Sequence, residues 1–186
     1  MPSYRTATHA DLNPCWEVRT RALRTGCIGH YPAATIELLC ASAAPDSMPR
    51  LFDVGGALVA EEDGRIVGYA VLDGHSGEVD AVFVEPEQGG RGIATALMRR
   101  LEALAARRGL NRLFLSASLN AVAFYERAGF ASVREELYPH RSGIAIGSVF
   151  MEKHLIPGQA DQTKVNVASC GRRDFGNPLL KSAGDE

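Results

Sequence analysis

The sequence has no long apolar run and no excess of positive charge. No stretch approaches the roughly 18 apolar residues of a membrane-spanning helix, and the opening residues, MPSYRTATHADL, lack the apolar segment of a signal peptide. The 20 Lys and Arg residues are outnumbered by 22 Asp and Glu, which leaves a formal net charge of −2. Without a basic excess, the chain is poorly suited to neutralise a nucleic-acid backbone. We therefore expect a cytoplasmic protein that binds neither membranes nor nucleic acids.

Clustered cysteines are also missing. The chain has four cysteines, far apart in the sequence and without a CxxC pair or a histidine cluster: Cys15, Cys27, Cys40 and Cys170. This spacing argues against a zinc site and a disulfide framework, and it predicts reduced thiols and no bound metal. What the chain does have is 46% hydrophobic and 23% charged residues, which are ordinary globular proportions. This composition predicts one full core and favours an intracellular enzyme that acts on small molecules.

Turn signals and apolar periods predict alternating strands and helices. Asp63-Gly64 is a strong two-residue hairpin signal between strand-like runs at 57–62 and 65–72. From Ile93 to Arg108 apolar side chains recur at helical spacing, and Gly109 suits the end of that helix. The other predicted elements are strands over 3–7, 77–84, 113–118, 130–135 and 144–153, helices ending at Gly26, running from 32 to 40 and spanning 121–128, and a loop over 44–50.

The first helix has two candidate starts. Thr8 followed by Asp11 is a capping-box pattern, whereas Asn13-Pro14 resembles an N-cap with proline at the first helical position. In either case the order of elements predicts an α/β (α+β) fold, a mixed sheet flanked by helices in a single domain. We expect this domain to span residues 1–156 and residues 157–186 to form a polar, flexible tail.

A glycine-rich turn, Gly89 to Thr95, separates the strand ending before Pro86 from the long helix. Glycines allow close approach of a ligand, and the first amides of a helix have no intrahelical partner, so the turn can bind an anion such as pyrophosphate. Six arginines and one acid over 91–112 favour a polyanionic ligand there: Arg91, Arg99, Arg100, Glu102, Arg107, Arg108 and Arg112. The structural alternative is a plain turn followed by a solvated arginine face. A P-loop is excluded because no Gly-Lys pair exists, and a Rossmann fingerprint is disfavoured.

A second motif, NAVAFYERAGF, begins at Asn120. Asn120 can simply cap the short helix, or it can contact a ligand. Tyr125 can be a core aromatic, or its phenol can act as a general acid for a departing thiolate.

At this separation, the two motifs resemble the GNAT superfamily of N-acetyltransferases. The resemblance covers about residues 3–154 in element order and is most specific over 78–135. It implies a mixed, mostly antiparallel sheet, acetyl-CoA as co-substrate, and direct acetyl transfer to a primary amine of a small molecule or peptide. The absence of cysteine from both motifs also favours direct transfer over a covalent acyl-enzyme.

The resemblance also implies roles for particular residues. Main-chain groups late in the third strand hold pantetheine and the acetyl carbonyl, and the turn amides hold the pyrophosphate. The Asn of the second motif lies near the pantetheine arm, and the Tyr protonates the thiolate. These positions are Val82, Phe83, Val84, Gly90, Arg91, Gly92, Ile93, Ala94, Thr95, Asn120 and Tyr125. One departure is Gly89, where the family often has Arg or Gln, with Gln88 displaced by one; we expect altered affinity and not loss of binding.

The sequence leaves the catalytic base and the acceptor open. Strand alternation places Glu78 and Asp80 on one face, where either could take the amine proton, attract the ammonium, or simply face solvent; water can also serve. Residues that could line the acceptor side, or merely lie on the surface, are His30, Tyr31, His75, Tyr138 and His140. Two alternative functions are a non-catalytic acyl-CoA sensor and an interaction module acting through 157–186. The oligomeric state, including a homodimer, also stays open.

Overall fold

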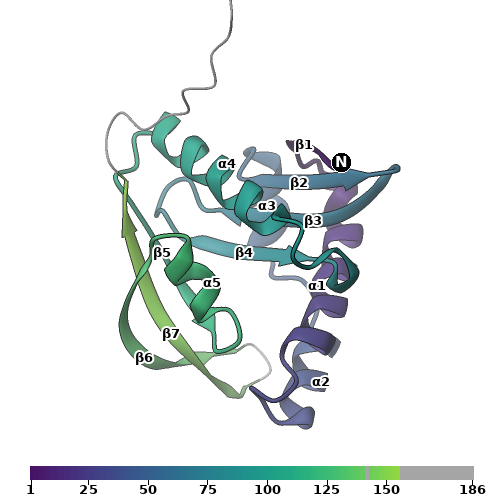
Figure 1. Cartoon of the computed structure of the whole chain (residues 1–186), viewed down its shortest axis with the longest axis vertical. Helices are drawn as coiled ribbons and strands as arrows, with labels where there is room; N and C mark the ends of the chain where they lie inside the picture. The colour runs from purple at the N-terminus through teal and green to yellow at the C-terminus, as the bar shows by residue number, and fades with distance from the viewer. Residues whose placement is uncertain (141–142, 156–186) are drawn as a thin grey trace, which may run out of the picture.

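The computed structural model describes residues 1–140 and 143–155. The strands are β1 Ser3–Thr6, β2 Ala57–Glu62, β3 Arg65–Leu72, β4 Val79–Val84, β5 Arg112–Ser118, β6 Ala131–Pro139 and β7 Ala145–His154. The helices are α1 Leu12–Gly26, α2 Ala33–Ala41, α3 Ser47–Asp53, α4 Ile93–Arg107 and α5 Val122–Arg127, with 3-10 turns at His9–Asp11 and Pro86–Gln88. The predicted mixed, mostly antiparallel sheet flanked by helices is confirmed (Figure 1). The tail predicted over 157–186 lies outside the described residues.

The first sheet is an antiparallel meander in the order β1-β2-β3-β4. The Asp63-Gly64 turn joins β2 to β3 as predicted, with φ of 52° at Asp63 and 71° at Gly64. Positive φ at both central residues is what a type I′ hairpin turn requires, which explains the Asp-Gly pair. Helix α4 packs on one face of this sheet, and α1 and α3 pack on the other.

Helix α4 buries the apolar stripe predicted from its sequence. The buried residues are Ile93, Leu97, Met98, Leu101 and Ala105, and they share a core with β2, β3 and β5. The helix continues to Arg107, and Gly109 follows it with φ of 77°. Because one face is fully buried, both the direction of α4 and the position of its N-terminus are fixed by the core.

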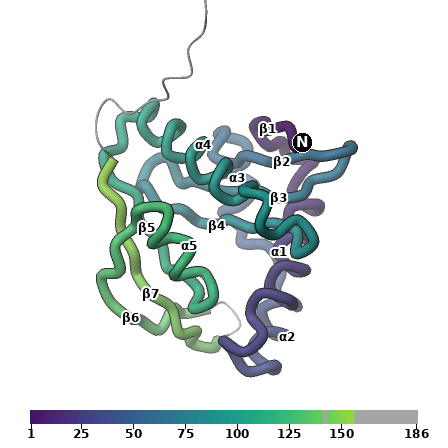
Figure 2. Tube along the Cα trace, viewed as in Figure 1, coloured from purple at the N-terminus to yellow at the C-terminus, as the bar shows by residue number. Residues whose placement is uncertain are grey.

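The second sheet has the order β5-β7-β6, and among the described residues its main chain is hydrogen-bonded to that of the first where β4 begins. Phe114 N donates to Gly77 O at 3.1 Å, and Glu78 forms an isolated parallel bridge with Phe114. Beyond this point β4 and β5 diverge, and α5 lies beside the resulting opening (Figure 2). The splay leaves one edge of β4 without a partner strand in the described chain.

At the far end of the opening, the segment between α1 and α2 makes hydrogen bonds to the second sheet and to the loop after β5. Tyr31 donates its hydroxyl proton to Gly147 O of β7 at 2.7 Å and accepts from Leu119 N at 2.8 Å. Cys27 Sγ lies 3.7 Å from Asn120 Oδ1. The second sheet is thus joined to the first near Gly77 and to the helical layer near Tyr31.

The N-terminal helices differ from prediction at two places. The chain enters α1 from the Thr8–Asp11 capping box and not at Asn13-Pro14. The loop predicted over 44–50 was wrong, because α3 begins at Ser47. Pro49 does not prevent this helix, because it lies in the first turn, where a missing N–H costs nothing. Met48, Leu51 and Phe52 at helical spacing are buried against the first sheet.

Asp11 is a buried carboxylate whose loss we expect to destabilise the fold. It accepts from Arg5 at 2.7 and 2.9 Å and from Thr8 N at 2.7 Å. The Arg5 guanidinium holds the pKa of Asp11 well below its ordinary value. Asp11→Asn should therefore lower the free energy of unfolding at neutral pH by about 1–3 kcal/mol in urea titrations.

The contribution of Asp11 to the free energy of unfolding should decrease as the pH falls. A depressed folded pKa stabilises the fold above the unfolded carboxyl pKa of about 3.9, and this contribution is lost as pH falls toward the folded value. The difference between wild type and Asp11→Asn should therefore shrink below about pH 4. Asp53→Asn is the control, since the Asp53 carboxylate is 61% exposed and, within the part of the chain that the structure describes, its ion pair is with His9 at 3.5 Å. Equal destabilisation by the two variants would contradict the role given to Asp11.

Across residues 1–140 and 143–155, no helix is long and apolar enough to cross a membrane.

Candidate functional site

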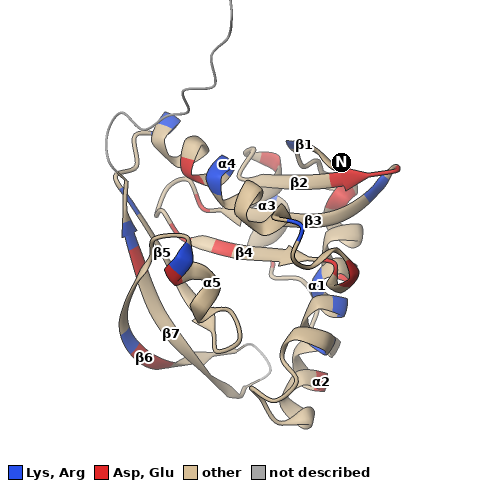
Figure 3. Ribbon diagram, in the orientation of Figure 1, with Lys and Arg blue, Asp and Glu red and all other residues tan. Residues whose placement is uncertain are grey.

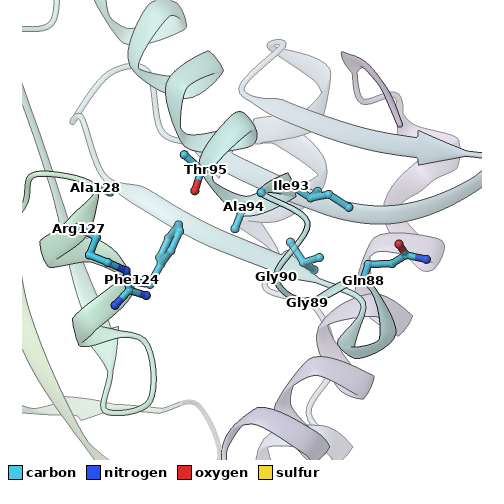
Figure 4. Close-up of a pocket in the computed structure, with 11 residues that line it drawn as sticks. Gln88, Gly89, Gly90, Ile93, Ala94, Thr95, Phe124, Arg127 and Ala128 are labelled. Carbon is cyan, nitrogen blue, oxygen red and sulfur yellow. The ribbon is translucent and has the colours of Figure 1, made fainter. Parts of the chain in front are cut away.

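A cavity of about 320 Å³ lies between the start of α4 and the side of α5. Its lining comes from the end of β4, the glycine turn, the first turn of α4 and one face of α5: Val84, Gln88, Gly89, Gly90, Gly92, Ile93, Ala94, Thr95, Phe124, Arg127 and Ala128. Figure 4 shows Phe124 and Arg127 across from Ala94 and Thr95, with the Gln88 side chain directed away from them. The turn singled out in the sequence is thus one wall of a cavity.

Backbone conformation explains the glycines of this wall. Gly90 has φ of 76° and Gly92 has φ of 78°, which L side chains rarely adopt. A Cβ atom at either position would meet nothing within 4 Å. Glycine is therefore required here by the turn, and the space beside it is open to a ligand.

The first amides of α4 are free to bind an anion. The first helical hydrogen bond runs from Ala96 N to Gly92 O at 2.9 Å, so the N–H groups of Ile93, Ala94 and Thr95 have no intrahelical acceptor. In the described chain no side chain caps Gly92. These amides line the cavity, and the helix dipole adds partial positive charge at the same end. Free amides and a helix dipole at one helix start are an arrangement that binds phosphate groups in other proteins.

The arginines of 91–112 are not gathered at this site. Arg91 makes a bidentate pair with Glu62 at 2.7 and 2.9 Å and also donates to Gln88. Arg100 stacks over Tyr4, and Arg112 pairs with Glu152. Figure 3 shows Lys and Arg distributed among Asp and Glu over several elements. The side chain of Arg91 therefore pairs with β2, and only its main chain is available to the turn.

The unpaired edge of β4 supplies a second set of main-chain donors. Glu85 N donates to Val67 O at 2.9 Å, so alternate residues of β4 direct their N–H and C=O groups to β3. By this alternation Phe83 bonds with Tyr69, whereas the main-chain groups of Val82 and Val84 face the opening toward β5. The strand edge predicted to hold a ligand thus offers Val82 and Val84. Phe83 instead contributes its ring to the opposite face of the sheet.

A β-bulge changes the expected positions of the two strand carboxylates. Ala81 pairs with Val71 and Val79 with Leu72, so Asp80 is the extra residue. Asp80 lines a second cavity on the face of β4 that bears Phe83, and that cavity is not lined by Glu78. Partial desolvation by neighbouring protein atoms raises the pKa of both carboxyl groups, although Asp80 keeps an exposed surface, and the negative charge of Asp80 further raises the pKa of Glu78. The strand pattern alone could not predict which carboxylate faces a cavity.

The family-model comparison agrees with this geometry. A model of the acetyltransferase (GNAT) family matches residues 23–130, more than half of the chain. This chain belongs to the GNAT acetyltransferase family. The resemblance predicted from the two motifs is confirmed.

Solved structures with the GNAT fold match most of the chain. A GCN5-related N-acetyltransferase from Rhodopseudomonas palustris is 27% identical, with a TM-score of 0.73, covering 83% of this chain and 96% of that one. The PaiA N-acetyltransferase from Thermoplasma acidophilum, in complex with coenzyme A, is 17% identical, with a TM-score of 0.64 and coverage of 83% and 99%. A phosphinothricin acetyltransferase from Sinorhizobium meliloti, in complex with acetyl-CoA, is 19% identical, with a TM-score of 0.61 and coverage of 89% and 94%.

In the second GNAT motif, Tyr125 packs in the core and Asn120 contacts a distant segment of the chain. Tyr125 is 8% exposed and packs edge-on against Phe124 and Phe130, and burial raises the pKa of its phenol above the ordinary value. Asn120 is not the N-cap of α5, which is Ala121. Its side chain instead reaches the end of α1 at Cys27. The capping role considered from the sequence is therefore wrong.

Arg127 is a cavity residue that sequence reasoning missed. It lines the cavity from α5, and no carboxylate in the described part of this GNAT chain pairs with it. The available signal was the spacing of Phe124 and Arg127, which puts them on one helical face. Nothing in the sequence indicated that this face turns toward α4.

Proposed function

We propose that this chain transfers the acetyl group of acetyl-CoA to a primary amine of a small molecule or peptide, by direct attack in a ternary complex. The observation that carries the proposal is the row of unpaired α4 amides opening into a cavity beside Gly90 and Gly92. Such amides bind phosphate groups, and coenzyme A carries a diphosphate. Membership of the acetyltransferase family supports the same reaction.

Two sets of main-chain groups would bind acetyl-CoA. The amides of Ile93, Ala94 and Thr95 would hold the diphosphate, with Arg127 adding a positive charge from α5. When bound, the cofactor supplies a thioester whose acetyl carbon is open to attack by an amine. The N–H groups of Val82 and Val84 face the opening where that carbonyl would lie, and their donation would stabilise negative charge developing on its oxygen.

Proton transfer needs a base and an acid. The attacking amine must be neutral, and Asp80 or Glu78 can take its proton directly or through water. A raised pKa makes each carboxylate a stronger base near neutral pH. Tyr125 would donate its phenolic proton to the leaving sulfur. Cys27 lies beside Asn120, but burial raises the pKa of its thiol and disfavours the thiolate, which supports direct transfer without an acyl-cysteine.

The proposal is tested by calorimetry and by thiol release. We expect acetyl-CoA and free coenzyme A to bind the full chain, and at least one amine from a panel of polyamines, amino acids, aminoglycosides and peptides to release free coenzyme A thiol. Absence of binding heat at millimolar coenzyme A would refute the cofactor site. Binding without thiol release from any amine would instead favour the non-catalytic sensor.

A further inference from the structure

The second cavity, which Asp80 lines, has features of an acceptor site. It measures about 570 Å³, which is large enough for a small molecule, and lies on the face of β4 away from α4. Its apolar walls come from α1, the segment around α3 and the first sheet, and they include Trp16, Pro45, Met48, Ala81 and Phe83. Its polar groups decide what it can bind.

Arg19 is a buried cation in the wall of this cavity. Its side chain lies with the guanidinium carbon 4.1 Å from the centre of the Trp16 ring, and the residue is 8% exposed. It donates to Leu39 O at 3.0 Å and to Ser42 Oγ at 3.4 Å. Both acceptors are neutral, and no carboxylate in the described chain pairs with Arg19. A buried guanidinium has five N–H donors, so it can bind an additional anion.

Tyr69 is a second polar group without a partner. It is 0% exposed, and among the described residues its hydroxyl has no hydrogen-bond partner. It lines the same cavity as Arg19 and Asp80. A buried hydroxyl without a partner costs free energy, and this cost is removed when a ligand supplies the missing acceptor.

Asp80 supplies the opposite charge. The bulge in β4 turns this carboxylate to the cavity beside Ala81 and Phe83. Asp80, Arg19 and Tyr69 all line this one cavity. The cavity thus presents a cation-binding group, an anion-binding group and a hydroxyl donor within apolar walls.

We propose that this cavity takes an amino acid with an apolar or aromatic side chain, whose carboxylate binds Arg19 and Tyr69 and whose ammonium binds Asp80. The inference rests on the acetyl transfer proposed above and names its substrate class. A polyamine would place positive charge against Arg19 and is disfavoured. An amino acid matches both charges, and its side chain would contact Trp16, Met48 or Phe83.

The test compares each amino acid with its own carboxamide on the wild-type chain. Thiol release from acetyl-CoA should be faster for the acid by about tenfold or more in kcat/KM, because the amide leaves Arg19 without its anion. The panel pairs phenylalanine, leucine and methionine with their amides. Equal or faster rates for the amides would overturn the inference and leave acetyl transfer standing. Coenzyme A binding without thiol release from any amine would overturn both.

A set of arginine variants separates recognition from structure. Arg19→Gln should bring the acid-to-amide ratio close to one while coenzyme A affinity stays unchanged, and Arg19→Lys should retain part of the preference. Arg21→Gln is the control on the same helix, since Arg21 pairs with Glu85 at the surface. If Arg19 only held α2 in place, Arg19→Gln would slow acid and amide equally, and that result would contradict the inference.

Discussion

Gly92→Glu is expected to abolish coenzyme A binding. The Cβ position of Gly92 faces open space at the start of α4, beside the free amides of Ile93, Ala94 and Thr95. A glutamate there would place bulk and negative charge in the proposed diphosphate site, where it could itself accept from these amides. Calorimetry should therefore show no binding heat for acetyl-CoA or coenzyme A at concentrations that saturate the wild type.

Gly109→Glu is the matched control for backbone strain. Gly109 has φ of 77°, a Cβ atom there would also meet nothing within 4 Å, and it follows the opposite end of the same helix. Both variants impose a similar conformational cost, but only Gly92→Glu changes the cavity. We expect Gly109→Glu to bind coenzyme A normally, and a retained wild-type affinity in Gly92→Glu would argue against the pyrophosphate site.

Tyr125→Phe is expected to lower kcat by about a hundredfold, which is a typical loss for a missing general acid. Phenylalanine preserves the ring contacts with Phe124 and Phe130, whose centroids lie 5.0 and 5.6 Å away, so the core should be unaffected. Affinity for coenzyme A should change little. Because burial raises the pKa of Tyr125, its phenol keeps its proton to higher pH than an exposed tyrosine does. The rate difference should therefore persist as pH rises.

The hydroxyl at Tyr4 provides the control. Tyr4 lies in β1, where its ring stacks against the guanidinium of Arg100, and it does not line the cavity between α4 and α5. Tyr4→Phe should therefore keep wild-type turnover. Steady-state rates across pH, with coenzyme A affinity measured in parallel, distinguish loss of an acid from loss of binding. Unchanged turnover of Tyr125→Phe at every pH would remove Tyr125 from the mechanism.

The parts of the fold that depend on local pattern could be predicted. The Asp63-Gly64 turn and the buried stripe of α4 follow from backbone preference and apolar period, which neighbouring residues determine. Helix α3 was missed because a helix of seven residues shows little apolar period in the sequence, and Met48 and Phe52 are buried only by packing against the distant first sheet.

The candidate site could be predicted only where one segment forms it. The glycine turn and the start of α4 are contiguous, so the sequence could predict them together as a candidate anion site. Arg127 lines the cavity because α5 packs across from α4, a helix distant from it in the sequence. Asp80 faces its cavity because of a bulge in β4, which strand alternation does not reveal. The capping role weighed for Asn120 failed for the same reason, since its side chain contacts Cys27 of a distant segment.

The hydrogen bonds at Gly77 and Tyr31 have a further consequence for the opening between β4 and β5. The second sheet is hydrogen-bonded to the first near Gly77 and to the segment between α1 and α2 near Tyr31, so both ends of the opening are held by contacts within the chain. An opening that is already held in place reduces the ordering entropy lost when a ligand binds. In the proposed reaction, we therefore expect both reactants to meet at a β4 edge that needs little rearrangement to receive them.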